Sequence, residues 1–278
     1  MLDHILPSIA EIRQSTHFLS APDATATVVK VGPFAVKFGP SVTLLEAENL
    51  KYVSTSSEVP VPEVFGTLVE PETGIRFIIM EFVPGPTLEK IWTSLHPLEK
   101  LDISNQLRTA LVHLRQLRPE QPGYLGSVGQ QALADGVFWK PGYDPAISGP
   151  FKNEAELNEG IIRKLAESES TSYMSLFRSL VSATLQGHQT AFTHGDLQAK
   201  NIIVHRTGTK GDGSGTGTFD VRIIDWEISG WYPEYWEFCN ATIIGRFRPE
   251  WLELVQQIMP TYPREYLMMQ TIRGIMFC

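Results

Sequence analysis

Two apolar runs that each lead into polar residues constrain this chain more than any other part of its sequence. They occur in residues 192–204, FTHGDLQAKNIIV, and in residues 221–227, VRIIDWE. Short apolar runs bounded by turn-forming residues are typical of buried strands. The pattern therefore predicts that Asp196, Asn201 and Asp225 occupy loops at the ends of neighbouring strands, within reach of a phosphate and its metal ion.

These residue types match the requirements of phosphoryl transfer. Moving a γ-phosphoryl group requires a carboxylate near the attacking hydroxyl and oxygen ligands that hold Mg²⁺ against the phosphates. Mg²⁺ is usually bound by a few protein oxygens together with substrate phosphates and water. We therefore predict Asp196 as the catalytic carboxylate, and Asn201 with Asp225 as the metal ligands. Taken singly, Asp196 could be a turn residue and Asn201 a cap.

The order His-x-Asp-x-x-x-x-Asn is the catalytic-loop pattern of eukaryotic-like kinases. Gly195 replaces the arginine that pairs with a phosphorylated activation loop in protein kinases, so control of that kind is not expected. With HGDLxxxNI followed by IDWE, the chain resembles the aminoglycoside phosphotransferase and choline kinase family of protein-kinase-like small-molecule kinases. The resemblance implies a bilobal α+β fold. Residues 1–83 would form a nucleotide-binding N-lobe with a small antiparallel sheet, ending in the hinge, and residues 84–278 a larger, mainly helical C-lobe with the catalytic loop and substrate site.

The N-terminal part contains a candidate phosphate-binding lysine. Residues 27–31 and 34–38 are β-rich runs joined by a Gly-Pro turn, which is a hairpin signal. The second run resembles the Val-Ala-Ile-Lys strand of kinases, which places Lys37 at the α- and β-phosphates. Lys30 is the alternative, although it is more easily explained as a solvated edge residue.

A glutamate on the next helix is the expected partner of Lys37. Residues 44–53 have helical spacing, and this spacing puts Glu46 on the same apolar face as Leu50 and Val53. The Glu-Ala-Glu-x-Leu string of the family also matches Glu46 to the pairing position. The alternative is an ordinary acid in a first helical turn, where the helix dipole favours it.

Residues 66–70 and 75–80 predict two further strands, the second of which runs into the hinge between the lobes. The resemblance implies that the carbonyl of Glu81 and the amide of Val83 bind the adenine base, with Met80 flanking it. An apolar strand that enters a Pro-Gly turn and binds no ligand is the alternative for these positions.

The stretch before the first strand, residues 20–27, contains no glycine. A protein-kinase phosphate loop is Gly-x-Gly-x-x-Gly, because glycines let backbone amides approach the phosphates. ATP remains the nucleotide that the resemblance implies, with GTP as the alternative, and the loop permits weaker binding. Asp23 would be electrostatically unfavourable close to the phosphates.

Several other segments carry predictions. Residues 121–150 are rich in Gly, Pro and aromatic residues, and predict an irregular segment that either faces the substrate or is a surface excursion packed by its own aromatics. Residues 207–218 predict a mobile hairpin tip rather than a phosphate-binding loop. Glu227 is expected to cap nearby backbone, with contact to a second metal as the alternative. His194 is expected to support the catalytic loop, and Glu237 to anchor it as an acid does in relatives.

Composition and charge restrict the classes of binding partner and the cellular compartment that we expect for this protein. A formal charge of −8 over 278 residues argues against nucleic acid, which requires clustered Lys and Arg, and mildly favours a cationic acceptor. Cys239 and Cys278 are too few for a disulfide framework, so both are expected to be free thiols in a reducing compartment. The N-terminus lacks a signal pattern and no run approaches the ~18 apolar residues of a membrane span. We therefore expect a cytoplasmic protein without a membrane partner.

The sequence thus predicts a Mg²⁺-dependent phosphotransferase that moves the γ-phosphate of ATP to a hydroxyl of a small molecule, such as an aminoglycoside-, choline- or sugar-like acceptor. A pseudokinase-like module that binds nucleotide without turnover is the alternative that the glycine-free loop permits. Phosphorylation of protein is disfavoured by Gly195 and by the absence of an Ala-Pro-Glu string after Asp225. The sequence indicates neither the identity of the acceptor nor an oligomeric state.

Overall fold

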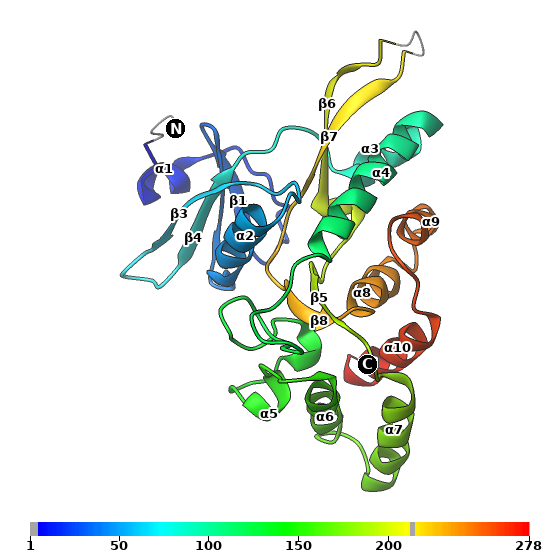
Figure 1. Cartoon of the computed structure of the whole chain (residues 1–278). Helices are drawn as coiled ribbons and strands as arrows, with labels where there is room; N and C mark the ends of the chain where they lie inside the picture. Colours follow the sequence, from blue (N-terminus) through cyan, green and yellow to red (C-terminus); the bar gives the residue numbers. More distant parts are fainter. Residues whose placement is uncertain (1–4, 212–214, 278) are drawn as a thin grey trace.

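The computed structural model describes residues 5–211 and 215–277. They form a small lobe built on an antiparallel sheet and a larger, mainly helical lobe (Figure 1), so the predicted bilobal α+β architecture is confirmed. The elements of the small lobe are α1 (Ile9–Gln14), β1 (Thr27–Val31), β2 (Phe34–Gly39), α2 (Leu45–Ser56), β3 (Val64–Val69) and β4 (Arg76–Glu81). Beyond them follow α3 (Leu88–Ile91), η1 (Trp92–Ser94), α4 (Pro97–Leu114), η2 (Gly136–Phe138), α5 (Pro145–Ser148), α6 (Glu154–Leu165), α7 (Thr171–Thr184), β5 (Thr190–Thr193), η3 (Ala199–Asn201), β6 (Ile202–Thr209), β7 (Gly217–Ile223), β8 (Gly230–Pro233), α8 (Trp236–Gly245), α9 (Pro249–Ile258) and α10 (Pro263–Met276). The lobe boundary predicted at residue 83 stays a prediction.

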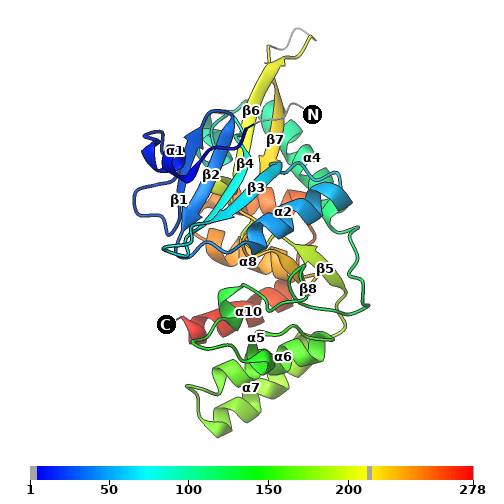
Figure 2. The same ribbon diagram turned by 90° about the vertical axis from the view of Figure 1, so that its left-hand side faces the viewer.

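The small lobe is a four-stranded sheet in the order β1-β2-β4-β3, and every neighbouring pair is antiparallel. Because side chains alternate along a strand, β2 directs Val36 to one face and both Ala35 and Lys37 to the other. Val36 packs in a cluster with Ile12 of α1, whereas Ala35 belongs to the core shared with α2 and the large lobe. Figure 2 shows α1 and α2 on opposite sides of the sheet. Lys37 therefore lies on the face directed toward α2 and the other lobe.

Helix α2 belongs to the small lobe and is hydrogen-bonded to the large lobe. Its buried face includes Glu46, Leu50 and Val53, as the helical spacing of the sequence predicts. Asn49, fully buried on the same helix, donates from Nδ2 to the carbonyl of Trp226 at 2.7 Å. Since Trp226 directly follows Asp225, this hydrogen bond fixes α2 against the segment that carries the predicted metal ligand.

The large lobe is built around α8, which is buried along almost its whole length and packs against α9 and α10. Two separate two-stranded sheets, β5 with β8 and β6 with β7, carry the motifs that the sequence singles out. The turn of residues 194–201 joins β5 to β6, and β7 ends at Ile223, two residues before Asp225. Ile202 pairs with Ile223 in the register of β6 and β7. The end of the catalytic turn therefore lies beside the start of the segment that carries Asp225.

The segment of residues 121–150 packs into the large lobe through its own aromatics. Phe138 is fully buried and stacks on Trp236 with ring centroids 5.4 Å apart. In contrast, Trp139 and Tyr143 are 66% and 67% exposed. The segment is therefore an ordered part of the lobe that presents two aromatic rings at its surface.

Three further sequence predictions concern segments away from the lobe interface. Strands β6 and β7 pair as far as Thr209 and Gly217, and residues 212–214 of the predicted hairpin tip lie outside the described residues. Cys239 is buried and free, whereas Cys278 also lies outside the described residues. Over the part of the chain that the structure describes, every helix is too short or too polar to cross a bilayer.

Candidate active site

The turn after β5 carries His194, Gly195 and Asp196. Gly195 has a φ of 88°, and a Cβ at this position would lie 3.0 Å from Cγ1 of Ile228, so only glycine fits without strain. Glu237, which is buried on α8, accepts hydrogen bonds from the amides of His194 at 2.6 Å and Gly195 at 3.2 Å. The prediction that Glu237 anchors the catalytic region is confirmed.

Asp196 and Asn201 lie in direct contact. Asn201 donates from Nδ2 to the carbonyl and to Oδ2 of Asp196, both at 2.9 Å. These bonds use the nitrogen of the amide and leave its Oδ1 as the atom that could bind a metal. The side chain of Asp196 is 18% exposed, so its carboxylate is oriented by the protein while remaining accessible to a small molecule.

Two further residues of this turn contact Asp196 and were missed by sequence reasoning. Gln198 donates from Nε2 to Oδ1 of Asp196, and Nζ of Lys200 lies 3.5 Å from Oδ2. Both occupy unspecified positions of the His-x-Asp-x-x-x-x-Asn pattern. The signal that could have found them is their position in the same tight turn, which brings every polar side chain close to the carboxylate.

The segment after β7 is hydrogen-bonded to this turn. The amide of Ile224 donates to the carbonyl of Asn201 at 2.9 Å, and the carbonyl of Ile224 lies 3.0 Å from Nε2 of His194. Because Nδ1 of His194 accepts from the amide of Asp196 at 3.2 Å, the proton of a neutral ring belongs on Nε2, which donates to Ile224. His194 thus joins the catalytic turn to the residue before Asp225, which agrees with its expected supporting role.

The backbone of Asp225, two residues after the end of β7, departs from the strand conformation. Its φ is 69°, a backbone conformation that residues with a side chain rarely adopt. Trp226, the next residue, is fully buried and donates from Nε1 to the carbonyl of Ile223 at 2.8 Å. The buried indole anchors this turn, so the unusual conformation of Asp225 is imposed by the surrounding structure.

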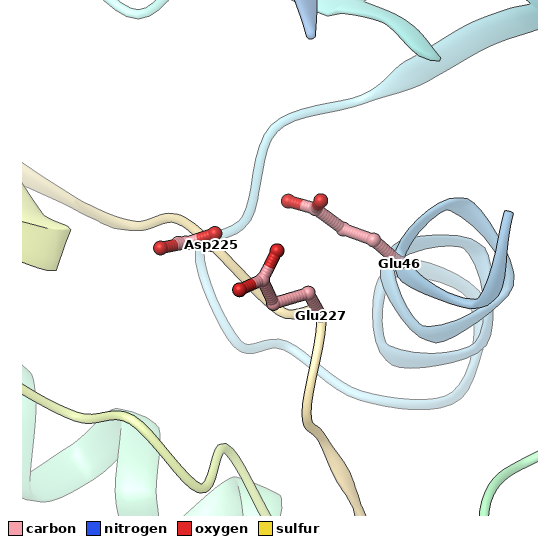
Figure 3. A group of neighbouring side chains, drawn as sticks. All are labelled: Glu46, Asp225 and Glu227. Carbon is pink, nitrogen blue, oxygen red and sulfur yellow. The ribbon is translucent and has the colours of Figure 1, made fainter. Parts of the chain in front are cut away.

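Lys37 reaches this turn from the other lobe. Its Nζ lies 2.7 Å from Oε2 of Glu46, 2.7 Å from Oδ1 of Asp225 and 2.9 Å from Oε2 of Glu227. Figure 3 shows the carboxylates of Glu46, Asp225 and Glu227 directed into a common space. The structure therefore brings together the predicted lysine, its predicted helical partner and a predicted metal ligand, from three different elements.

Burial and charge act in opposite directions within this cluster. Burial alone would lower the pKa of the Lys37 ammonium, but the charges of Glu46, Asp225 and Glu227 raise it. Burial raises the pKa of Glu46 to about 7, although Lys37 opposes that shift. Burial also disfavours ionisation of Asp225, yet Lys37 beside it lowers the pKa of that carboxyl below its ordinary value. The cluster thus holds a permanently charged lysine that keeps Asp225 ionised.

The preferred expectation for Glu227, that it caps nearby backbone, was wrong, and its alternative, contact with a second metal, stays a prediction. Its carboxylate pairs with Lys37 instead of capping backbone, because a positive charge arrives from a strand that is distant in the sequence. Carboxylate oxygens of Glu46, Asp225 and Glu227 lie within 4.8 Å of one another. With Oδ1 of Asn201 on the adjoining turn, these hard oxygen donors fit Mg²⁺ better than a softer metal.

The predicted hinge residues lie where the chain leaves the sheet of the small lobe. Met80 is buried in β4, Glu81 ends that strand, and Val83 is buried just beyond it. Within the described chain, the amide of Val83 makes no backbone hydrogen bond. Lys30, the alternative to Lys37, places its Nζ 3.9 Å over the ring of Phe82. Binding of adenine by Met80, Glu81 and Val83 stays a prediction.

The glycine-free loop of residues 20–27 is held by hydroxyl groups. Ser20 accepts from the amide of Val28 at 3.0 Å, and Ser41 donates to the carbonyl of Thr25 at 2.9 Å. Asp23 is exposed at the surface of this loop. In protein kinases, glycines determine the backbone conformation of the corresponding loop. Here, side-chain hydrogen bonds hold it in place.

Comparison with known proteins adds to this geometry. The model of the phosphotransferase enzyme family matches residues 18–266, and no curated protein matches the chain. Among solved structures, a choline/ethanolamine kinase family protein from Mesorhizobium loti is 16% identical, covering 94% of this chain and 76% of its own, with a TM-score of 0.51.

Two aminoglycoside phosphotransferase structures are similar in the same way. The GDP complex of aminoglycoside 2′-phosphotransferase-IIIa is 13% identical, covering 94% of this chain and 84% of its own, with a TM-score of 0.58. The complex of a thermostable APH(4)-Ia mutant with ADP and hygromycin B is 13% identical, covering 96% and 90%, with a TM-score of 0.52. Likeness at such low identity concerns the fold, and it confirms the predicted protein-kinase-like architecture.

Proposed function

Because the chain belongs to the phosphotransferase enzyme family, we propose that it is a Mg²⁺-dependent kinase that transfers the γ-phosphate of ATP to a hydroxyl of a small molecule. The contacts of Lys37 with carboxylates of both lobes are the observation that supports this proposal most directly. A buried ammonium from one lobe lies 2.7 Å from Asp225 of the other, and such a pair suits a site in which phosphates and their metal ion lie between the lobes.

The residues of the site divide the chemistry among them. Asp196 accepts the proton of the acceptor hydroxyl, and the oxygen of that hydroxyl bonds to the γ-phosphorus. The bond from the γ-phosphorus to the bridging oxygen of the β-phosphate breaks, and ADP leaves. Asn201 and Gln198 hold the carboxylate of Asp196 in place. Lys37, oriented by Glu46, neutralises the α- and β-phosphates.

Asp225 and Asn201 would hold the metal ion, with Glu227 as a further oxygen donor on the same rim. Bound Mg²⁺ would supply neutralisation of the charge that develops on the phosphate oxygens. Lys37 occupies the space between the carboxylates of Asp225 and Glu227, so it must share these carboxylates with the ion. The oxygen of the Asn201 amide remains available throughout, since its nitrogen is bonded to Asp196.

The acceptor and the nucleotide are proposed on separate grounds. The complex of a similar protein with ADP and hygromycin B supports a nucleotide together with a small hydroxylated acceptor, and the net charge of −8 favours a cationic one. A similar protein that binds GDP keeps GTP as the alternative donor. Binding of adenine at the Glu81 carbonyl and the Val83 amide remains part of this proposal.

A screen of ATP consumption tests the proposed function. The purified protein is incubated with Mg²⁺, ATP or GTP and a panel of hydroxylated amines, sugars and antibiotics, beside the Asp196→Asn variant as matched control. We expect acceptor-dependent release of ADP, or of GDP where GTP is the donor, by the wild type alone, with nucleotide binding retained by the variant in a thermal-shift assay. Nucleotide binding without turnover on any acceptor would instead support a binding module, and equal turnover by the variant would remove Asp196 from its assigned role.

A further inference from the structure

The peptide that links Gly195 to Asp196 is hydrogen-bonded on both sides. Its carbonyl, which belongs to Gly195, accepts from Nδ2 of Asn240 at 2.8 Å. Its amide, which belongs to Asp196, donates to Nδ1 of His194 at 3.2 Å. Because this peptide carries the backbone into Asp196, its plane sets, together with the hydrogen bonds from Gln198 and Asn201, where the carboxylate of Asp196 points.

Asn240 is fixed by partners that leave it a single orientation. It is fully buried on α8, and its Nδ2 donates to Gly195 and, at 2.9 Å, to Oδ2 of Asp135. Its Oδ1 accepts from Nη2 of Arg273 at 2.7 Å. Since a guanidinium can only donate and a carboxylate can only accept, the amide cannot flip without losing these bonds.

Asp135 organises the other side of this network. Its carboxylate, 1% exposed as a residue, accepts from the amide of Val137, from Nε1 of Trp236, from Asn240 and from Arg273. Arg273 supplies the compensating positive charge, with Nη2 at 2.8 Å from Oδ2. A buried carboxylate with this many donors is costly to disturb, so it holds its neighbours firmly.

The network joins segments that are far apart in the sequence. Asp135 lies directly before η2 in the aromatic segment of residues 121–150, Asn240 lies in the central helix α8, and Arg273 lies in the last turns of α10. None of these side chains belongs to the phosphotransfer motifs. Among the hydrogen bonds and ion pairs of the described residues, the only one that joins these side chains to the catalytic turn is the bond from Asn240 to Gly195.

We propose that Asn240, held by Asp135 and Arg273, is a positioning residue that sets the plane of the Gly195–Asp196 peptide and thereby aims the carboxylate of Asp196 at the acceptor hydroxyl. The inference rests on the proposed function, because it assigns Asn240 a role through Asp196. Rotation of this peptide would displace a carboxylate that must lie within hydrogen-bond reach of the reacting proton. Among the hydrogen bonds of the described residues, none joins Lys37, Asp225 or the hinge residues to this peptide, so binding of nucleotide should change little.

The test compares two substitutions that remove the donor but differ in volume. Asn240→Ala leaves a small cavity and Asn240→Leu fills it, so a shared effect reports the lost hydrogen bond rather than packing. Thr242→Val is the control, since Thr242 is buried two residues further along the same helix and donates only to carbonyls of Phe238 and Cys239 in that helix. Hydrolysis of Mg²⁺-ATP with water as acceptor, and transfer to any acceptor found in the screen, give kcat and the KM for ATP.

Both Asn240 variants should lower kcat by up to about 10²-fold, the loss that a misplacement near 1 Å can cause, and leave the KM for ATP within about twofold. Thr242→Val should leave both parameters unchanged. Arg273→Lys, which keeps the charge, should retain more of kcat than Arg273→Met. A purely structural role would lower the melting temperature of the variants without changing kcat per folded molecule.

Hydrogen exchange provides a readout that is independent of turnover. The amide of Asp196 should exchange about tenfold faster in Asn240→Ala than in the wild type, while the amides of β5 keep their protection. Unchanged exchange and unchanged kcat in both Asn240 variants of an active enzyme would overturn the positioning role alone. A wild type no more active than Asp196→Asn, with water and with every acceptor, would overturn the proposed function and this inference with it.

Discussion

Replacing Lys37 by methionine removes the charge on which three carboxylates converge, and it leaves a side chain of similar length. The cost is concentrated at Glu46, whose side chain is 3% exposed, while those of Asp225 and Glu227 are 30% and 47% exposed. Removing one partner of a buried ion pair costs about 3–5 kcal/mol, because the other charge stays buried. Glu227 is screened by water and adds little, and Asp225, which is partly buried, adds less than Glu46.

The size of this loss should depend on pH. Burial raises the pKa of Glu46 from its ordinary 4.5 to about 7, so the folded state binds this proton more tightly than the unfolded state does. Such a group contributes stability that is complete below pH 4.5 and is lost as the pH rises through 7. We therefore expect Lys37→Met to lose about 3–5 kcal/mol of unfolding free energy at pH 8, and clearly less at pH 5.5, where Glu46 is neutral.

Urea unfolding followed by circular dichroism measures this loss at the two pH values. The double variant Lys37→Met/Glu46→Gln removes both charges, so it should recover most of the stability that the single variant loses at pH 8. The double variant could instead be as unstable as Lys37→Met, or the loss of unfolding free energy could be the same at pH 5.5 and pH 8. Either result would show that the cost of a buried, unpaired Glu46 carboxylate does not explain the destabilisation.

Three other substitutions test separate parts of the site. Asp196→Asn should slow phosphoryl transfer about 10²- to 10⁴-fold, the range for a lost general base, with unchanged affinity for Mg²⁺-ATP by calorimetry; wild-type rates would contradict its assignment. In the wild type, the rise of the Glu46 pKa from 4.5 to about 7 should lower the unfolding free energy by about 3 kcal/mol between these pH values, at about 1.4 kcal/mol per pH unit. Glu46→Gln should not show this decrease, and parallel curves of unfolding free energy against pH for the two proteins would refute the raised pKa of Glu46. Gly195→Ala places a Cβ 3.0 Å from Cγ1 of Ile228 at a φ of 88°, so it should cost roughly 1–3 kcal/mol in urea unfolding and lower kcat; a variant as stable and active as the wild type would show that the turn tolerates a side chain.

The sequence sufficed for the parts of the site that follow from local periodicity and motif order. Helical spacing placed Glu46 on the buried face of α2, and strand alternation agrees with Lys37 facing the other lobe. The apolar residues that follow Asp196 and precede Asp225 form β6 and β7, which pair with Ile202 opposite Ile223. The buried position of Glu46 follows from one short segment, whereas the choice of Lys37 over Lys30 came from the resemblance to the Val-Ala-Ile-Lys strand of kinases.

The sequence could not show contacts made between distant segments. The pairing of Glu227 with Lys37 depends on how the small lobe sits on the large one. The bonds of Asn240 to Asp135 and Arg273 join a loop and two helices, and nothing in their local patterns distinguishes them from surface polar residues. Such residues are found only when the chain has folded around them.

Calorimetric titration of ATP tests the central claim most directly, which is that Lys37 and Asp225 form a shared site for nucleotide and metal between the lobes. With Mg²⁺ in excess, the wild type should bind ATP at least about tenfold more tightly than in EDTA, a gain of about 1.4 kcal/mol. Asp225→Asn should lose that gain, and Lys37→Met should bind ATP weakly in both conditions. Equal dissociation constants for all three proteins, with and without Mg²⁺, would contradict the account.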